Sequence, residues 1–237
     1  MASRYICRKR KLKYQPKRSA STKKQRLVTV SRLPPYLQSM GLGNQLKTTL
    51  RYCERNVSLN PGVSGAVASY AFSCNGLYDP NKTGIGHQPI AFDQIMLMFD
   101  HYVVTGATIT AYCQNQDSTY QQFVGIQCDD NAASLVTHDP NTLIEQGRGK
   151  RALLDQFGTS ADTRILKMRV DPNKFMSRSN ALCDPELKGS VTANPVEQCF
   201  FQLWAAPVIS ADSSQCIVTV VIDYEVTFIE PKTLAGS

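Results

Sequence analysis

The stretch CIVTVVIDYEVTFI, residues 216–229, limits most narrowly what this chain can fold into. Its odd positions include Thr219, Asp223, Glu225 and Thr227, whereas every even position is apolar. Alternation with a period of two, rich in β-branched side chains, predicts one long strand with a buried face and an exposed face. Pro231 is expected to end the strand. The residues on the buried face are Cys216, Val218, Val220, Ile222, Tyr224, Val226 and Phe228.

Seven further stretches show β patterns, which brings the predicted strands to eight. In residues 163–170 the alternation places Leu166, Met168 and Val170 inward and Lys167 and Arg169 outward. The seven stretches are residues 46–56, 65–74, 102–114, 121–128, 150–157, 163–170 and 198–206.

Two short helices are expected between the strands. In QPIAFDQIMLMFDHY, residues 88–102, Pro89 suits the first turn of a helix, and GIGHQP (84–89) is expected to form the turn that leads into it. The large apolar residues at helical spacing there are Phe92, Ile95, Met96 and Phe99.

The second predicted helix lies in HDPNTLIEQG, residues 138–147. Asp139 can cap its start, Pro140 fits the first turn, and Gly147 fits the exit. Eight strands with long connections and no regular βαβ alternation predict an all-β fold, an eight-stranded antiparallel jelly-roll sandwich with short helices in its connecting loops.

Charge is divided unequally along the chain. Residues 1–32 hold 12 Lys or Arg and no Asp or Glu, so their net charge is +12. Residues 33–237 hold 14 Lys or Arg and 19 Asp or Glu, so their net charge is −5. The first segment has too little apolar surface to fold alone, so we expect a disordered basic arm with its linker over 1–43. A jelly-roll domain is expected over 44–232 and a short tail over 233–237.

A flexible arm of this charge is expected to bind a polyanion by releasing its condensed counterions. Tyr5 and Tyr14 can stack on bases, and RKRK, residues 8–11 (Arg8, Lys9, Arg10 and Lys11), is also typical of a nuclear localisation signal. The residues predicted to contact nucleic acid are Arg4, Arg8, Lys9, Arg10, Lys11, Lys13, Lys17, Arg18, Lys23, Lys24, Arg26 and Arg32.

GRGKR, residues 147–151, is a second basic cluster, expected in a loop. Because no Ser or Thr follows the lysine at P-loop spacing, it predicts no nucleotide site. A solvated loop is the default interpretation, and a genome or receptor contact is the alternative.

No enzyme, cofactor or metal site is expected from the sequence. A cysteine could be combined with His101 and Asp100, or with His138 and Asp139, but no known nucleophile motif flanks them. The acidic stretch CDDN (128–131), with Asp79 and Asp93 elsewhere, could offer oxygen ligands to calcium, yet it lacks the EF-hand spacing and is typical of turns. The three histidines show no zinc-ligand pattern with cysteine.

The cysteines are expected to be reduced thiols, several of them on core faces, because none shows a CxxC spacing and no secretory signal is visible. NKT, residues 81–83, is for that reason expected to be a silent glycosylation sequon. No apolar run is long enough to predict a membrane span. The eight cysteines are Cys7, Cys53, Cys74, Cys113, Cys128, Cys183, Cys199 and Cys216.

Residues 75–104, NGLYDPNKTGIGHQPIAFDQIMLMFDHYVV, resemble a stretch of capsid proteins from small circular single-stranded DNA viruses, the circovirus-like group that encodes a replication initiator. Residues 194–206, NPVEQCFFQLWAA, and the basic N-terminus before a β domain are similar to the same group. The shared residues are Gly76, Leu77, Tyr78, Asp79, Gly86, His87, Gln88, Pro89, Phe92, Asp93, Gln94, Asp100, His101 and Tyr102.

The resemblance implies a coat protein whose many copies, sixty or a multiple, form an icosahedral shell with the arm directed at a single-stranded DNA genome. It also implies a virion location, a nuclear stage with a host import receptor, and a host-cell receptor of unknown identity. Two alternatives stay open. One is a jelly-roll coat protein of a small RNA virus, and the other is a cellular nucleic-acid-binding β-sandwich that does not assemble.

Overall fold

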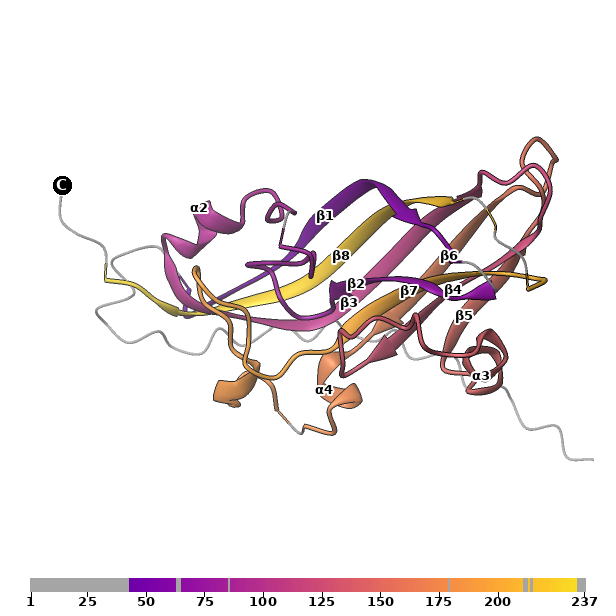
Figure 1. The fold of residues 1–237 in the computed structure, drawn as a ribbon. Coiled ribbons are helices and arrows are strands. Elements are labelled where there is room, and N and C mark those ends of the chain that lie inside the picture. The colour runs from indigo at the N-terminus through magenta and orange to yellow at the C-terminus, as the bar shows by residue number, and fades with distance from the viewer. Residues whose placement is uncertain are drawn as a thin grey trace, which may run out of the picture.

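The computed structural model describes residues 43–62, 65–84, 86–178, 180–210, 213 and 215–233. Within them, two four-stranded sheets form two layers (Figure 1). The first sheet has the order β1 (Gln45–Leu59), β8 (Cys216–Pro231), β3 (Phe99–Asn115) and β6 (Thr163–Val170). The second has the order β2 (Ala68–Ser73), β7 (Phe200–Pro207), β4 (Gln122–Asp129) and β5 (Gly149–Leu154). No helix in these ranges is long and apolar enough to cross a membrane.

All the strand pairs of both sheets are antiparallel. From β1 to β4 the chain changes sheet at every step, and β5 then stays beside β4 in the second sheet. The chain returns to the first sheet with β6, and β7 and β8 again lie in the second and the first sheet. Eight strands arranged in this order over two facing sheets make a jelly roll. The predicted fold class is therefore confirmed.

Strand β8 follows the alternation that its sequence predicts. From Cys216 to Val226 each even residue is buried and each odd one is partly exposed, and the pattern becomes buried on both faces from Val226 to Ile229. Ala181 and Leu187, which belong to the connection between β6 and β7, pack with Ile229 over the outer face there. Pro231 is the last residue of the strand, which agrees with its expected role as a terminator.

The main core lies between the two sheets and contains large aromatic groups that are completely buried, among them Tyr52, Tyr102 and Tyr224. The hydroxyl of Tyr224 donates a hydrogen bond of 2.7 Å to the backbone oxygen of Ser73. A buried phenol needs such a partner, and here the bond links β8 of one sheet to the end of β2 in the other. Burial raises the pKa of Tyr224 well above its ordinary value, so the group stays a donor.

The predicted second helix forms as α3 (Pro140–Glu145), with the Asp139 carboxylate accepting from the backbone N–H of Asn141. The first forms only as the five-residue α2 (Phe92–Met96), because Phe99 already belongs to β3 and pairs with β8. The helix predicted to include Phe99 was therefore too long at its C-terminal end. Figure 1 shows α2 at one end of the sandwich and α3 toward the other.

Two further short helices, α4 (Pro172–Phe175) and the 3-10 turn η2 (Pro185–Leu187), were not predicted. Each follows an aspartate whose carboxylate caps the first turn, Asp171 before α4 and Asp184 before η2. Both lie in the long connection between β6 and β7.

Most predicted strands form within a few residues of their expected bounds, and 163–170 matches β6 fully. The buried positions there are Leu166 and Val170, with Met168 half-buried and Lys167 and Arg169 exposed, as expected. One prediction was wrong at its end: residues 155–157 leave β5, because the Asp155 carboxylate accepts from the Gln156 backbone and starts a turn. The part of GRGKR from Gly149 to Arg151 is strand and not loop.

Candidate functional site

The residues expected to bind nucleic acid, from Arg4 to Arg32, lie outside the described residues, and so does the predicted localisation signal, residues 8–11. Both assignments stay predictions. The described body offers four other features with functional character: a basic strip, an apolar groove, a hydrogen-bonded loop junction and a cluster of thiols.

The basic strip runs along β5 and β6, which are edge strands of the two sheets and contact each other along one side of the sandwich. Residues 148–169 contain six Lys or Arg and only two Asp. All six cationic side chains are exposed: Arg148, Lys150, Arg151, Arg164, Lys167 and Arg169. The second basic cluster of the sequence thus joins the outward cations of β6 on one surface.

Few of these charges are neutralised by the body. Arg169 pairs with Glu225, with 2.7 Å between Nη2 and Oε2, and the other five make no ion pair within 4.0 Å in the described ranges. Asp155 lies in the turn between the two strands, where a hydrogen bond from Gln121 lowers the pKa of its carboxyl and the field of Arg164 adds to the effect. The strip therefore presents a net positive surface.

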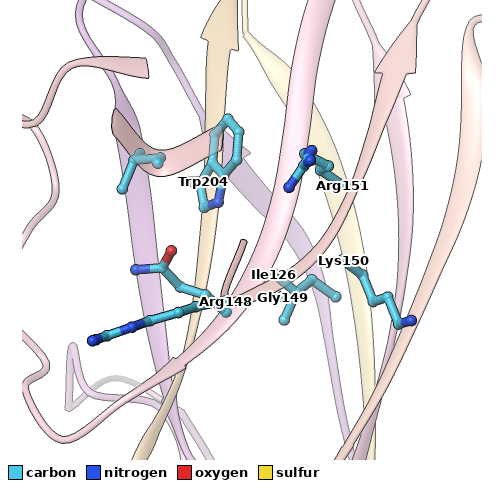
Figure 2. A pocket seen from close by; sticks show the side chains of 8 residues that line it. Ile126, Arg148, Gly149, Lys150, Arg151 and Trp204 are labelled. Atoms are coloured by element: carbon cyan, nitrogen blue, oxygen red, sulfur yellow. The ribbon is translucent and has the colours of Figure 1, made fainter. Parts of the chain in front are cut away.

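Figure 2 shows a small hollow at the β5 side of this strip, with Arg148 and Lys150 extending in opposite directions beside Gly149. Its volume of about 10 Å³ holds about one water molecule. Trp204 at its wall is buried and packs with Leu143 of α3, and its ring lies so close to Gly125 that any side chain there would collide with it. This hollow is too small for an organic substrate, and the exposed cations around it suit a polyanion that lies across them.

The apolar groove lies along β1, which is an edge strand of the first sheet. Its volume is about 630 Å³, and its walls are β1 from Thr48 to Cys53 and the segment that includes Ile90 and Ile95. Ile90 is 85% exposed and the nearby Leu97 is 73% exposed. An edge strand beside exposed aliphatic groups is typical of surfaces that contact another protein.

His87 is one of the residues that line this groove. Its Nε2 lies 2.9 Å from the backbone oxygen of Cys53 on β1, and its Nδ1 lies 2.8 Å from the backbone oxygen of Gln88. Because carbonyl oxygens only accept hydrogen bonds, both contacts are satisfied together only when the imidazole is protonated. These carbonyl groups, first Gln88 and then Cys53, and the charge of Glu54 raise the pKa of His87, against a smaller lowering by burial.

The loop junction brings together the two segments that carry the family resemblance. The side-chain oxygen of Asn194 accepts from the backbone N–H of Tyr78 at 3.0 Å and of Asp79 at 3.2 Å. Gly76 lies so close to Asn194 that an added side-chain carbon would stand 2.6 Å from its amide carbon. The Gly76–Asp79 stretch is thus a rigid loop seated on the segment before β7.

The thiol cluster consists of Cys74, Cys128 and Cys199, whose sulfur atoms all lie within 4.8 Å of one another. All three side chains are buried, and the seven described cysteines are free thiols. Burial raises the pKa of Cys74, and hydrogen bonds from the Cys199 and Cys74 thiols lower the pKa of Cys128. Five of the seven are buried, in agreement with the core positions expected for several of them.

The structure does not bring together the Cys–His–Asp combinations considered for catalysis or the aspartates considered for calcium. His101 bonds to Glu230 at 2.7 Å, and among the described residues no hydrogen bond joins a cysteine sulfur to a histidine ring. In CDDN the Asp129 carboxylate accepts from the Asn131 backbone, as in an ordinary turn. Asp79, Asp93, Asp129 and Asp130 do not gather with other ligands into a group of three in the ranges described.

Sequence reasoning missed the thiol cluster and the Asn194 junction, because both join residues far apart in the chain. A signal for the cluster was present. The three cysteines lie at the ends of strands that are neighbours in a jelly roll, on positions that alternate inward with buried Phe72 and Phe201. Spacing patterns such as CxxC cannot reveal a group assembled by strand pairing.

No protein-family model matches the sequence, and no curated protein matches it either. Among solved structures, the chain is similar to that of Mud crab tombus-like virus, with a TM-score of 0.46, 12% identity, and 85% of this chain and 100% of that chain covered. A semi-empty VLP of the giant freshwater prawn Macrobrachium rosenbergii nodavirus gives a TM-score of 0.44, 10% identity, and 98% and 97% coverage. The picornavirus capsid of an equine rhinitis A virus particle gives a TM-score of 0.40 at 12% identity, with 100% of both chains covered.

Proposed function

We propose that this chain is the coat protein of a small virus, and that its copies assemble into an icosahedral shell that packages single-stranded DNA. The observation that carries the proposal is a jelly-roll body joined to a terminal segment with 12 Lys or Arg and no Asp or Glu. The resemblance of residues 75–104 and 194–206 to capsid proteins of small circular single-stranded DNA viruses supports it, and is the reason that we name DNA. The role is structural and calls for no catalytic step.

In this proposal the arm holds the genome without reading its sequence. Each Lys or Arg that neutralises a phosphate releases a counterion, so the log–log dependence of affinity on salt steepens by about −0.7 per contact on a single strand. A shell of sixty copies would bring about 720 positive charges from residues 1–32 to its interior. That charge condenses a nucleic acid whose path differs at every subunit. The strip on β5 and β6 is a second surface of the same sign.

The body supplies the contacts between copies. A closed shell requires surfaces that recur on every subunit and meet the same partners each time. The large aliphatic groups most exposed on the described body are Ile90, Val196 and Leu97, at 85%, 81% and 73%. Ile90 lines the groove beside the edge of β1. Burial of these aliphatic groups between subunits would contribute free energy in proportion to the apolar area removed from water.

RKRK, residues 8–11, gives the arm a second use before assembly. A basic cluster of this kind is recognised by nuclear import receptors, and an arm not yet engaged with a genome is accessible to them. The two uses follow each other in time and do not compete. We therefore place the chain in the virion and, during assembly, in the host nucleus.

The proposal is tested with three proteins: the full chain, the chain without residues 1–32, and a full-length variant in which the 12 Lys or Arg of the arm are replaced by Gln. Binding of a labelled single-stranded DNA is measured over a range of salt concentrations, and particles are imaged by electron microscopy. The full chain should bind with a steep salt dependence, and both altered proteins should lose it while the body stays folded. Equal binding by the truncated body would overturn the role of the arm.

The two alternatives give different outcomes. Particles whose contents are digested by ribonuclease and not by deoxyribonuclease would assign the chain to the RNA-virus alternative. A full chain that sediments as a monomer or dimer, with no shells under any salt condition, would favour a cellular nucleic-acid-binding protein.

A further inference from the structure

The jelly-roll topology gathers three cysteines at one end of the second sheet. In that sheet β7 lies between β2 and β4, and it runs antiparallel to both. The start of β7 therefore meets the ends of β2 and β4. Cys199 immediately precedes β7, Cys74 immediately follows β2, and Cys128 is the penultimate residue of β4. A backbone hydrogen bond of 2.8 Å from Cys74 N to Cys199 O extends the pairing to the two cysteines.

Strand alternation points all three side chains into the sandwich. Cys74 follows Phe72 at the inward spacing of β2, and Cys199 precedes Phe201 at the inward spacing of β7. Cys128 is opposite Phe201 in the register of β4 and β7, and it also belongs to the core. Cys74 and Cys199 are 0% exposed and Cys128 is 8% exposed.

The sulfur separations suit a common metal ligand set. Three sulfurs that bind one zinc ion at about 2.3 Å lie roughly 3.8 Å apart, since the angles at the metal are near tetrahedral. The three sulfurs here lie within 4.8 Å of one another, so small rotations about χ1 bring them to that spacing. The group contains no histidine and no carboxylate in the described part of the chain. A set made only of sulfur selects soft cations and disfavours calcium and magnesium.

We propose that Cys74, Cys128 and Cys199 form a three-sulfur site for a soft, thiophilic d10 cation such as Cu⁺ or Zn²⁺. Binding converts the thiols to thiolates and releases up to three protons to solvent as three metal–sulfur bonds form. Three thiolates with Cu⁺ leave a net charge of −2, and with Zn²⁺ a net charge of −1. Three sulfurs alone complete a trigonal Cu⁺ site, whereas Zn²⁺ takes a water as its fourth ligand.

A route from solvent leads to the cluster beside Cys128. This residue lines a cavity of about 570 Å³ between the end of β4 and the segment from Met168 to Phe175. Arg169 and Lys174 line the same cavity, together with Asp171. Lys174 pairs with Asp171 at 3.6 Å and Arg169 pairs with Glu225, so these charges compensate one another and the cavity wall adds little net charge beside the three thiolates.

A second pair of cysteines supplies the matched control. Cys113 on β3 and Cys216 on β8 are also buried, at 1% and 0% exposure, and they belong to the same core. They lie outside the group of three. If the three cysteines acted only as small core hydrophobes, Cys128→Ser and Cys113→Ser would have comparable effects on metal binding.

The site stands apart from the proposed coat-protein role and is tested on the full chain. The protein is purified anaerobically with a non-thiol reductant, stripped of metal with a chelator, and titrated with Co²⁺ and Cd²⁺ as spectroscopic probes, and then with Zn²⁺ and Cu⁺ in competition. One probe ion per chain and a sulfur-to-metal charge-transfer band are expected. Cys128→Ser and Cys199→Ser should weaken binding at least ~100-fold, because each removes a ligand, whereas Cys113→Ser should retain it.

X-ray absorption of the wild-type chain loaded with Cu⁺ or Zn²⁺ keeps the test decisive if a variant fails to fold. Three sulfur neighbours of the metal ion and no nitrogen neighbour support the site. Three neighbours in total indicate the trigonal Cu⁺ geometry, and a fourth neighbour that is oxygen indicates the Zn²⁺ geometry. The proposal is overturned if no charge-transfer band appears, if fewer than three sulfurs bind, or if Cys113→Ser weakens binding as much as Cys128→Ser.

Discussion

The hydroxyl of Tyr102 donates a hydrogen bond of 3.3 Å to the side-chain oxygen of Asn194, a residue 92 positions away in the sequence. The same hydroxyl accepts a bond of 3.0 Å from the backbone N–H of Leu77. Asn194 in turn holds the backbone of Tyr78 and Asp79. One asparagine and one tyrosine therefore anchor the loop after β2 to β3 and to the segment before β7.

Asn194→Ala should lower the free energy of unfolding by about 2–3 kcal/mol, because the donors that bond to Asn194 lose their acceptor inside a half-buried junction. Tyr102→Phe keeps the ring and loses only its hydroxyl, so a smaller loss of about 1 kcal/mol is expected. Urea unfolding of the body measures both. Asn60→Ala, at an exposed position, is the control. Equal stabilities of the Asn194 and Asn60 variants would show that the junction carries no stability.

Protonation of His87 should stabilise the body. Its pKa in the folded chain is raised above the ordinary 6.5, first by the Gln88 carbonyl and then by Cys53 O and Glu54. For a raised histidine pKa, the stabilisation is fully present below the unfolded pKa and is lost as pH rises through the folded one. The aromatic ring that faces the imidazole is Tyr52, at 4.7 Å between centroids, and Tyr52 stays neutral there because burial and Glu54 raise its pKa.

The measurement is an NMR titration of the His87 ring, together with unfolding curves on both sides of neutral pH. His87→Gln should remove the pH-dependent part of stability that the wild type shows in this window, while His101 and His138 remain in both proteins. A His87 pKa below 6.5 would contradict the two-carbonyl geometry as a determinant of its charge.

Ile90→Asp should prevent assembly and leave folding intact. Ile90 is 85% exposed, so the fold gains little from it, whereas a charge buried between two subunits without a partner is strongly unfavourable. Sedimentation of the full chain reports assembly, and thermal unfolding reports the fold. Ile90→Leu preserves the apolar volume and should still assemble. Normal shells from Ile90→Asp would remove the groove beside β1 from the subunit contacts.

Gly125→Ala should destabilise the second sheet by about 1–3 kcal/mol, since the new methyl group would collide with the buried ring of Trp204. The fluorescence of Trp204, the single tryptophan of the chain, reports the local change directly. Gly43→Ala is the matched control, because its methyl group would come no closer than 3.4 Å to its nearest neighbour. An unchanged emission spectrum with unchanged stability would contradict the close packing of ring and glycine.

Local patterns predicted most of the fold. The period-two alternation in 216–229 and 163–170 gave the buried face of each strand correctly, because a half-buried strand has little freedom in which face it turns inward. The helical spacing of Phe92, Ile95, Met96 and Phe99 predicted a helix that was too long. Pairing of Phe99 with Pro231 at the end of β8 overrides that preference, and no local pattern encodes such a partner.

The candidate sites were less predictable, because tertiary contacts create them. The basic strip unites GRGKR with residues of β6 that follow it after a turn, and only the contact of the two edge strands makes one surface of them. The Asn194 junction and the thiol cluster need the jelly-roll strand order before their members become neighbours. The charge segregation of residues 1–32, by contrast, is readable from the sequence without any fold.

Electron microscopy of the purified full chain tests whether it is a self-assembling shell subunit that holds its genome by its arm. The chain is imaged beside the Lys/Arg→Gln arm variant, with nuclease digestion of the particle contents. Closed shells of uniform size are expected from both proteins, filled with nuclease-sensitive DNA only when the arm is charged. Full-length protein that forms no closed particles, or shells filled equally well with a neutral arm, would contradict this role.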